Sequence, residues 1–318
     1  MKLVLPGGSG FLGQVLAREF LTRGHDVVVL ARHPRVRYGR FVPWDGRSVG
    51  DWAAELDGAD AVVNLAGRSV NCRYTKTNLT QMFASRVDST RAVGLAIHAA
   101  QRPPPVWLQM STATIYAHRF DAPNDEINGV LGGNELGAPT YWRMSVEIAR
   151  AWERTFWESD TLATRKVALR SAMVMGNQPG SVFDVLMRLS RLRLGGPIAG
   201  GQQYVSWIHE ADFFRALEFL IDRADIEGVV NVVAPEALPQ RDFMAVLRRA
   251  CGLNFGLPAT AWMLALAAVV QRTDAELLLK SRRVAPRRLV EAGFTFQYPT
   301  WALAARDLVE RSIHRASA

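Results

Sequence analysis

The sequence has very little cysteine: Cys72 and Cys251 are the only two among 318 residues, and they lie far apart. Two cysteines cannot form the disulfide framework of a small secreted domain, and their wide separation excludes a CxxC metal or redox motif. We therefore expect a protein of a reducing compartment that has no metal site.

Long hydrophobic runs are also missing. The most apolar stretch, residues 261–270, is far shorter than the roughly 20 residues that a membrane-spanning helix needs. The chain passes from Met1 and Lys2 directly into an apolar run and a glycine-rich segment, without the charged and apolar regions of a secretory signal. We expect a cytoplasmic protein without a membrane partner.

Lysine is scarce, because only Lys2, Lys76, Lys166 and Lys280 are lysines among the 38 basic residues. The formal net charge is nevertheless +8, and the arginines are scattered along the chain. Their tightest cluster, residues 282–288, lacks the interleaved aromatic side chains of a surface that binds single-stranded nucleic acid. We therefore expect no nucleic-acid partner.

The composition is that of an ordinary folded protein, with 49% hydrophobic and 21% charged residues. Residues 2–6 and 26–30 are short apolar runs that predict strands, and residues 11–23 carry apolar side chains at helical spacing. Further short apolar runs follow at residues 41–42, 61–65, 106–110 and 167–169. Because these runs are continuous, both faces of the strands must be buried, which predicts a parallel sheet covered by helices.

The later part of the chain indicates a second, smaller region. Glycine-rich loops interrupt the strand pattern after residue 176, and helices punctuated by prolines dominate from residue 235. We predict an α/β fold, a Rossmann-type doubly wound parallel sheet with a smaller, mostly helical C-terminal substrate domain. The first predicted domain, which holds the sheet, is residues 1–175 plus 205–234, and the second, smaller domain is residues 176–204 plus 235–318.

A glycine-rich segment follows the first predicted strand and opens the first predicted helix. Its glycines fit a Gly-x-x-Gly-x-x-Gly or a Gly-x-Gly-x-x-Gly pattern, which is typical of a turn that binds the pyrophosphate of a dinucleotide. The phosphate charge meets backbone N–H groups and the positive end of the helix dipole, and a Cβ at the crowded positions blocks that approach. The candidate cofactor-binding residues here are Gly7, Ser9, Gly10, Phe11, Leu12 and Gly13.

The second predicted strand is followed by Arg32 and His33, where a site that prefers NAD carries a carboxylate for the ribose 2′-hydroxyl. A guanidinium at this place pairs with a 2′-phosphate, so the sequence predicts NADP, or its reduced form NADPH, as the cofactor. His33 is interpreted as a loop residue that lines the adenine. The alternative is a basic surface loop, since arginine is abundant in this chain.

Taken together, these motifs resemble those of the extended short-chain dehydrogenases/reductases of the NAD-dependent epimerase/dehydratase superfamily. The resemblance is to the atypical subgroup of epimerase family proteins with a C-terminal domain of unknown function. It extends over nearly the whole chain, through residues 7–13, 64–67, 85–86, 111–116, 152–153, 169–170, 195–197, 206–209 with 212, and 286–294. It implies that Leu65 and Ala66 flank the adenosine side of the cofactor, with Gly67 beside them.

By the same resemblance, Thr112 falls at the position of the family's catalytic Ser or Thr, and Tyr141 at that of its catalytic tyrosine. The family pattern has a lysine four residues later, which lowers the pKa of the phenol and binds the nicotinamide ribose, whereas this chain has Ser145. The lysine nearest in sequence is Lys166. Two alternatives stay open: Tyr141 packs against the core at a helix start, and Thr112 satisfies a local backbone group.

The missing lysine bears on the reaction that this site supports. A phenol without assistance has a pKa of ~10 and is only ~0.1% ionised at pH 7, so it is a poor base but a fully loaded proton donor. The sequence therefore favours an NADPH-dependent oxidoreductase that reduces a small carbonyl or sugar-like substrate. The alternative is a non-catalytic protein that binds NADPH as a sensor or regulator.

Two further expectations concern His209 and the quaternary state. His209 is interpreted as a hydrogen-bonded structural residue in preference to an acid-base group. Members of the superfamily often dimerise through two long helices, which correspond here to residues 78–100 and 141–159. The resemblance therefore also implies a homodimer.

Overall fold

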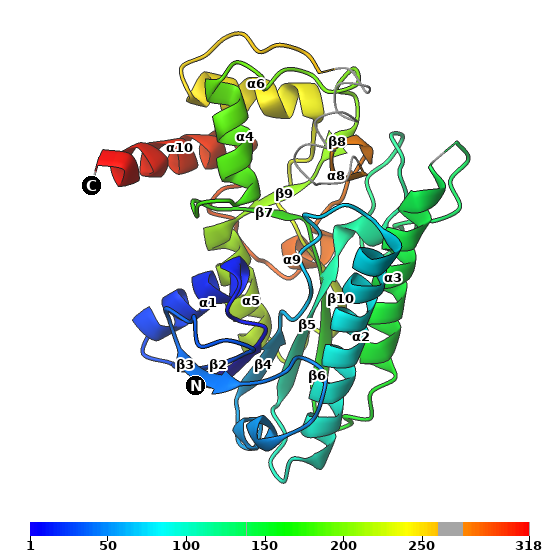
Figure 1. The fold of residues 1–318 in the computed structure, drawn as a ribbon, viewed down its shortest axis with the longest axis vertical. Helices are drawn as coiled ribbons and strands as arrows, with labels where there is room; N and C mark the ends of the chain where they lie inside the picture. The colour runs from blue at the N-terminus through cyan, green and yellow to red at the C-terminus, as the bar shows by residue number, and fades with distance from the viewer. Residues whose placement is uncertain (138, 260–275, 318) are drawn as a thin grey trace.

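The computed structural model describes residues 1–137, 139–259 and 276–317. Its centre is a seven-stranded sheet with the order β10-β6-β5-β4-β1-β2-β3, in which the neighbouring strands are parallel (Figure 1). The strands are Lys2–Pro6 (β1), Asp26–Ala31 (β2), Arg40–Pro43 (β3), Ala61–Asn64 (β4), Val106–Thr112 (β5), Arg165–Ser171 (β6) and Gly228–Val232 (β10). The chain winds outward in both directions from β1 and β4, which confirms the predicted Rossmann-type fold.

The strands are apolar throughout because helices cover both faces of the sheet. Successive residues of β1 alternate between the faces: Leu5 packs in one apolar cluster and Val4 in the other. Helices α1 (Phe11–Thr22) and α5 (Glu210–Asp222) cover the first face, and α2 (Lys76–Ala99) and α3 (Thr140–Trp157) the second (Figure 1). Phe20 of α1 and Phe156 of α3 are fully buried on these two faces.

The predicted strands are all present, and β5 and β6 are longer than the apolar runs that predicted them. Their ladder continues through Ser111 and Thr112, which pair with Arg170 and Ser171. Polar side chains end the apolar pattern there, but the backbone hydrogen bonds of the sheet do not depend on side-chain polarity. The extra length carries these polar residues to the carboxyl edge of the sheet.

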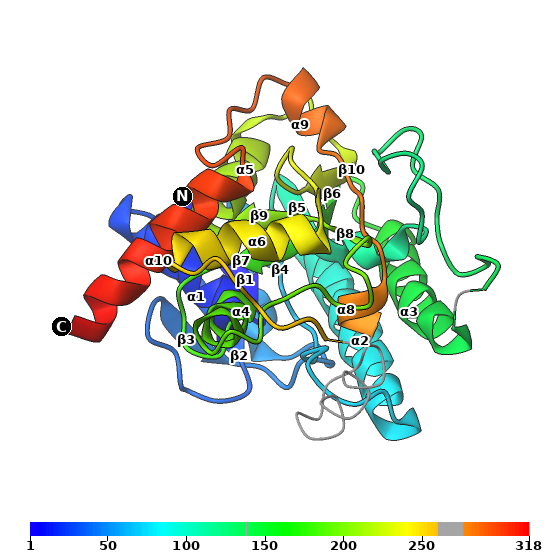
Figure 2. The ribbon, with the colours of Figure 1, turned by 90° about the horizontal axis from the view of Figure 1, so that it is seen from above.

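The remaining part of the fold is mostly helical, as predicted. Within the described ranges, its helices are α4 (Val182–Arg191), α6 (Gln240–Ala250), α8 (Glu276–Leu279), α9 (Arg287–Glu291) and α10 (Trp301–Ser317), with 3-10 turns η1 (Asp51–Glu55) and η2 (Ala113–Ile115) elsewhere in the chain. Helices α4, α6 and α10 gather at one end of the molecule (Figures 1 and 2). They enclose an apolar cluster of their own, in which the rings of Phe243 and Trp301 stack at 4.0 Å.

Two short sheets connect this helical part to the main sheet. β7 (Met173–Met175) pairs in parallel with β9 (Trp207–His209), and β8 (Tyr204–Val205) pairs antiparallel with β11 (Leu238–Pro239). After β6, the described part of the chain returns to the main sheet once more, as β10 beside β6. The division into two domains stays a prediction, and residues 261–270 lie outside the described residues.

Candidate active site

Two glycines in the turn after β1 are required by the packing of backbone on backbone. Gly7 has a φ of +77°, and a Cβ built on it would lie 2.5 Å from the Cα of Ala66. A Cβ on Gly13 would overlap the Cα of Gly8. The segment after β4 and the first turn of α1 therefore both lie against the end of β1, where only glycine leaves enough room.

Gly10, unlike Gly7 and Gly13, is not crowded by neighbouring backbone. Among the described residues, a Cβ built on Gly10 would approach only the carbonyl oxygen of Gly7, at 4.0 Å. Ser9 and Gly10 are exposed, and no side chain caps the helix that begins at Phe11. The positive end of the α1 dipole therefore faces open space, which fits the binding of an anionic group such as a pyrophosphate.

The loop after β2 is held beside this turn by Gln14 of α1. The Gln14 Nε2 donates to the carbonyl oxygen of Gly8 at 2.9 Å, and its Oε1 accepts from the backbone N–H of Arg37 at 2.9 Å. Arg32 and His33, in the same loop, are exposed. Within the described part of the chain, the Arg32 guanidinium has no hydrogen bond or ion pair, so it is available to a ligand.

The segment after β4 is fixed by a buried amide pair that sequence reasoning missed. The Asn64 Oδ1 accepts from the N–H of Ala66 at 3.1 Å, and its Nδ2 donates to the Gln109 Oε1 at 2.9 Å. The N–H of Leu65 donates to the carbonyl oxygen of Pro6 at 2.8 Å. The sequence signal for this pair was Asn64 itself, because it is a polar residue inside the apolar run 61–65. The three predicted cofactor-binding segments thus meet at one edge, while their ligand stays a prediction.

Arg86 of α2 adds a cation to this edge, although sequence reasoning gave it no role. A Cβ built on Gly67 would lie 3.4 Å from the Arg86 Cζ, and the guanidinium lies over the Trp152 ring at 4.9 Å. Its Nη1 donates to the Met82 carbonyl oxygen at 3.0 Å, and no described carboxylate pairs with it. Burial lowers the pKa of Arg86 to about 10, so the side chain is still charged at pH 7.

Thr112, the first predicted catalytic residue, ends β5 at the same edge. Its Oγ1 accepts from the backbone N–H of Thr114 at 3.2 Å, which caps the short turn η2. This is the local backbone role that the sequence left open. A hydroxyl that accepts a hydrogen bond keeps its own proton, so this contact leaves Thr112 able to donate to a substrate.

Tyr141, the second predicted catalytic residue, belongs to the first turn of α3, but its side chain lies outside the described residues. The catalytic and packing alternatives for Tyr141 therefore both stand. Ser145, one turn later on the same helix, is buried, and its Oγ donates to the Glu276 Oε2 of α8 at 2.5 Å. Ser145, which the resemblance places where the family has its lysine, thus contacts the C-terminal region.

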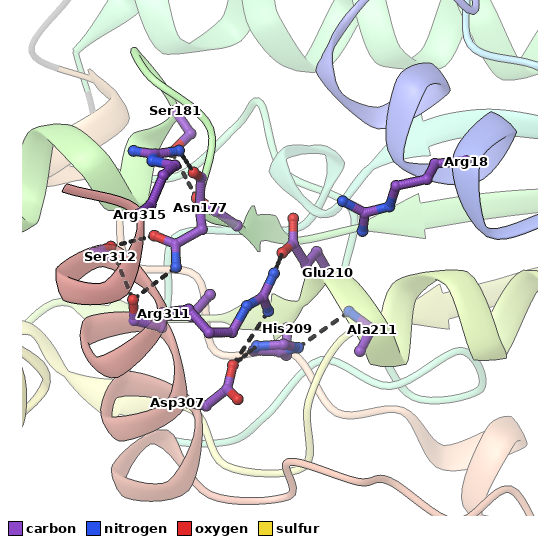
Figure 3. Close-up of polar contacts among 12 residues, drawn as sticks. Arg18, Asn177, Ser181, His209, Glu210, Ala211, Asp307, Arg311, Ser312 and Arg315 are labelled. Carbon is purple, nitrogen blue, oxygen red and sulfur yellow. Dashed lines mark hydrogen bonds and ion pairs between the residues drawn. The ribbon is translucent and has the colours of Figure 1, made fainter. Parts of the chain in front are cut away.

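His209 caps a helix. Its Nδ1 accepts from the N–H of Ala211 at 3.1 Å, and its Nε2 lies 3.1 Å from the Asp307 Oδ2 of α10 (Figure 3). The Nδ1 contact places the ring proton on Nε2, which faces the carboxylate. The side chain is fully buried, and this burial lowers its pKa. These contacts support the structural interpretation of His209.

The same contacts fasten α10 to the region near the glycine turn. The Arg311 Nη2 donates to the Glu210 Oε1 at 2.5 Å, next to the His209 and Asp307 pair (Figure 3). A Cβ on Gly176 would overlap both the Glu210 carboxylate and the Phe11 ring. The last helix is therefore linked, through Glu210, to the residue that opens α1.

Two further hollows in the described part of the surface lie away from this edge. Two surface hollows of about 330 and 970 Å³ lie elsewhere, one between α2 and α3 near Arg91 and Asp160, and one at the amino ends of the strands near Asp60. Ligands of doubly wound sheets bind at the opposite, carboxyl edge. In the ranges that the structure describes, no cluster of His, Cys, Asp and Glu could hold a metal, and no helix is long and apolar enough to cross a membrane.

Known proteins resemble this chain in sequence. Residues 3–233 match the model of the NAD dependent epimerase/dehydratase family, and residues 259–308 match the domain of unknown function DUF1731. The human epimerase family protein SDR39U1 is 30% identical over 97% of this chain and 100% of its own length. The epimerase family protein YfhF of Bacillus subtilis is 26% identical over 97% of this chain and 98% of its own length.

Solved structures agree with these matches. The crystal structure of human SDR39U1 (isoform 2) with NADPH superposes with a TM-score of 0.84, at 28% identity, over 98% of this chain and 99% of that one. UDP-N-acetylglucosamine 4-epimerase from Bacillus cereus, at 17% identity, shares the fold with a TM-score of 0.74 over 98% and 99% of the two chains. The resemblance predicted from the motifs is confirmed: this chain belongs to the NAD-dependent epimerase/dehydratase family and carries DUF1731 toward its C-terminus.

Proposed function

We propose that this chain binds NADPH at the carboxyl edge of its sheet and uses it to reduce a small carbonyl or sugar-like compound. The observation that carries the proposal is an open, uncapped glycine turn flanked by Arg32 and Arg86, two cations without a described carboxylate partner. The crystal structure of the human relative contains NADPH, which supports the same cofactor for this chain.

The residues at this edge fit the parts of the cofactor. Backbone N–H groups of residues 9–13 would hold the pyrophosphate, and the Arg86 guanidinium would add a positive charge on the side of Gly67. Arg32 would pair with the 2′-phosphate, and His33 would line the adenine. Leu65 and Ala66 would flank the adenosine.

When bound, NADPH supplies the hydride, so the chain must supply a proton. Thr112 retains a hydroxyl proton while its oxygen caps η2. Tyr141 stands at the position that the resemblance gives to the donor, and an ordinary phenol, with a pKa of ~10, is a loaded proton donor at neutral pH. Both groups suit reduction better than abstraction of a proton from an alcohol.

Calorimetry with NADPH and a screen of carbonyl compounds, including nucleotide-sugars, tests this function. We expect tight NADPH binding and loss of NADPH absorbance with at least one compound, weakened in the Tyr141→Phe variant. Undiminished turnover in that variant would remove Tyr141 from the mechanism. Tight binding with inertness across the screen would favour the sensor alternative, and absence of NADPH binding would contradict both.

The same proposal assigns the cofactor and the substrate to different parts of the chain. Residues 1–175 plus 205–234 would hold the cofactor, and residues 176–204 plus 235–318 would shape the substrate side. A homodimer through α2 and α3 is expected by analogy with the superfamily. Analytical ultracentrifugation of the full chain tests the dimer directly.

A further inference from the structure

Lys280 is a buried lysine in a chain that has only four. Its side chain lies just after α8, in the part of the chain that matches DUF1731, and it is only 2% exposed. Removing an ammonium group from water costs several kcal/mol unless other groups compensate for it. A buried lysine therefore needs partners, and those partners indicate what it does.

The first partner of Lys280 belongs to the catalytic edge of the main sheet. Its Nζ donates to the carbonyl oxygen of Thr114 at 3.0 Å. Thr114 lies two residues after Thr112, in the turn η2 that the Thr112 hydroxyl caps. The ammonium thus lies at the end of β5, although it is 166 positions away from Thr114 in the sequence.

The second partner connects Lys280 to α3, the helix that carries Tyr141. The Lys280 Nζ lies 3.9 Å from the Glu276 Oε1, and the other oxygen of that carboxylate accepts from the Ser145 Oγ at 2.5 Å. One carboxylate therefore joins Lys280 to the position where the family pattern has its lysine. In Figure 2, α8 is drawn between α6 and α3.

The surrounding contacts hold the segment in place. The N–H of Ser281 donates to the His118 Nδ1 at 2.7 Å, and the Arg282 Nε donates to the Thr114 Oγ1 at 3.2 Å. Among the described residues, the charged and titratable groups that act on Lys280 or are affected by it are Glu276, Arg282, Glu135 and His118. The segment is thus fixed on several sides against elements of the catalytic edge.

We propose that Lys280 supplies, from the C-terminal domain, the positive charge that α3 lacks at Ser145, and that Glu276 positions it there. The inference rests on the proposed function, because it places the ammonium beside the reacting end of the cofactor. Its role is electrostatic: a fixed positive charge stabilises the negative charge that develops on a carbonyl oxygen during reduction. In this proposal, a lysine in the C-terminal region provides the positive charge that the family pattern has on the helix of its catalytic tyrosine.

The ionisation of Lys280 suits this role. Burial, the largest cause, lowers its pKa, whereas the Glu276 carboxylate raises it, and the net result is a pKa of about 8. Lys280 is therefore charged at pH 7 and becomes neutral within the pH range in which a folded protein can be studied. This provides a test that needs no substrate.

The test compares the affinities for NADP⁺ and NADPH as a function of pH. The oxidised nicotinamide carries a positive charge and the reduced one does not, so a nearby ammonium weakens NADP⁺ binding selectively. As the pH rises through about 8, we expect the ratio of the NADP⁺ to the NADPH dissociation constant to fall on the order of tenfold. Titration of the 2′-phosphate cancels in this ratio.

Variants assign the effect to Lys280. Lys280→Met should make the ratio independent of pH, and Lys280→Arg should keep it high throughout. Glu276→Gln should move the midpoint to lower pH, because the carboxylate that raises the lysine pKa is gone. Lys166→Met, on a partly exposed lysine beside Trp157, is the matched control and should behave like the wild type.

The outcomes separate this inference from the proposed function. Absence of NADPH binding in the wild type overturns both. Normal NADPH binding with a ratio that is flat in the wild type overturns the role of Lys280 alone, even if Lys280→Met fails to fold. A pH-dependent ratio that persists in Lys280→Met also overturns that role, because another group then causes it.

Discussion

The backbone of Ala66 lies directly against Gly7. A Cβ on Gly7 would come within 2.5 Å of the Ala66 Cα and 2.7 Å of its backbone nitrogen. The close approach joins the ends of β1 and β4, the two strands from which the sheet winds in opposite directions. It therefore shapes the crevice in which a doubly wound sheet binds its ligand.

Gly7→Ala should therefore destabilise the fold. The positive φ costs about 1–2 kcal/mol for a residue with a Cβ, and displacement of the Ala66 backbone should bring the total above about 3 kcal/mol. Urea unfolding measures the change. The control is Gly46→Ala, because Gly46 has a φ of +85° and no atom lies within 4 Å of the new Cβ. This variant should lose only the stability that the positive φ costs. Equal losses in the two variants would contradict the packing argument.

Gly10→Val should separate binding from stability. Gly10 has an ordinary extended backbone and open space before its Cβ, so the free energy of unfolding should change by less than about 1 kcal/mol. The valine side chain would occupy the space proposed for the pyrophosphate, and the NADPH dissociation constant should rise at least about tenfold. Calorimetry and thermal melting measure both quantities. Gly50→Val, at the extended N-cap of η1, should leave binding unchanged.

Arg32→Ala should change the choice of cofactor. Loss of a charge-assisted hydrogen bond to the 2′-phosphate costs about 1.5–3 kcal/mol, so NADPH affinity should fall about tenfold to a hundredfold. NADH lacks that phosphate, and its affinity should stay the same. Arg91→Ala, which removes an exposed arginine of α2, is the control for net charge. An equal loss of affinity for NADH and NADPH would show that Arg32 does not contact the 2′-phosphate.

Arg86→Met should weaken both nucleotides alike. The guanidinium lies beside Gly67 and, in the proposed complex, faces the pyrophosphate that NADH and NADPH share. We expect about a tenfold loss for each, with little loss of stability, because a half-buried cation without a described carboxylate partner is replaced by an apolar side chain. Unchanged affinity for both nucleotides, measured by calorimetry, would assign Arg86 to packing against Trp152 alone.

His209 should make the fold sensitive to acid. Burial lowers the pKa of His209 in the folded state below its ordinary value of 6.5. As the pH falls, the unfolded chain therefore binds a proton at His209 before the folded chain does. The contribution of His209 to the free energy of unfolding is fully present above pH 6.5, and it falls below that pH by up to about 1.4 kcal/mol per pH unit. His209→Asn keeps a capping side chain and should flatten this dependence in urea unfolding at several pH values. The exposed His98, changed to Asn, should leave the slope unaltered.

The sequence alone determined the parts of this protein that depend on local patterns. Apolar runs, helical spacing and the glycine segment each require only neighbouring residues, so the sheet, the turn after β1 and the place of Arg32 were predictable. The hydrogen-bond partners of Gln14 and Asn64 were not, because these amide groups join segments that only the sheet order brings together, even though the polar Asn64 at the end of an apolar run is visible in the sequence. The catalytic role of Tyr141 stays a prediction.

Only the tertiary structure decided what surrounds the position of the missing lysine. Ser145 and Glu276 are 131 positions apart, and Lys280 and Thr114 are 166 apart. No periodicity or spacing relates such residues, since their contacts arise when the C-terminal region packs on the carboxyl edge of a sheet built by earlier segments. The local motif therefore shows only that position 145 is Ser145 and not a lysine. The packing of α8 against α3 and the end of β5 brings Lys280 close to that position.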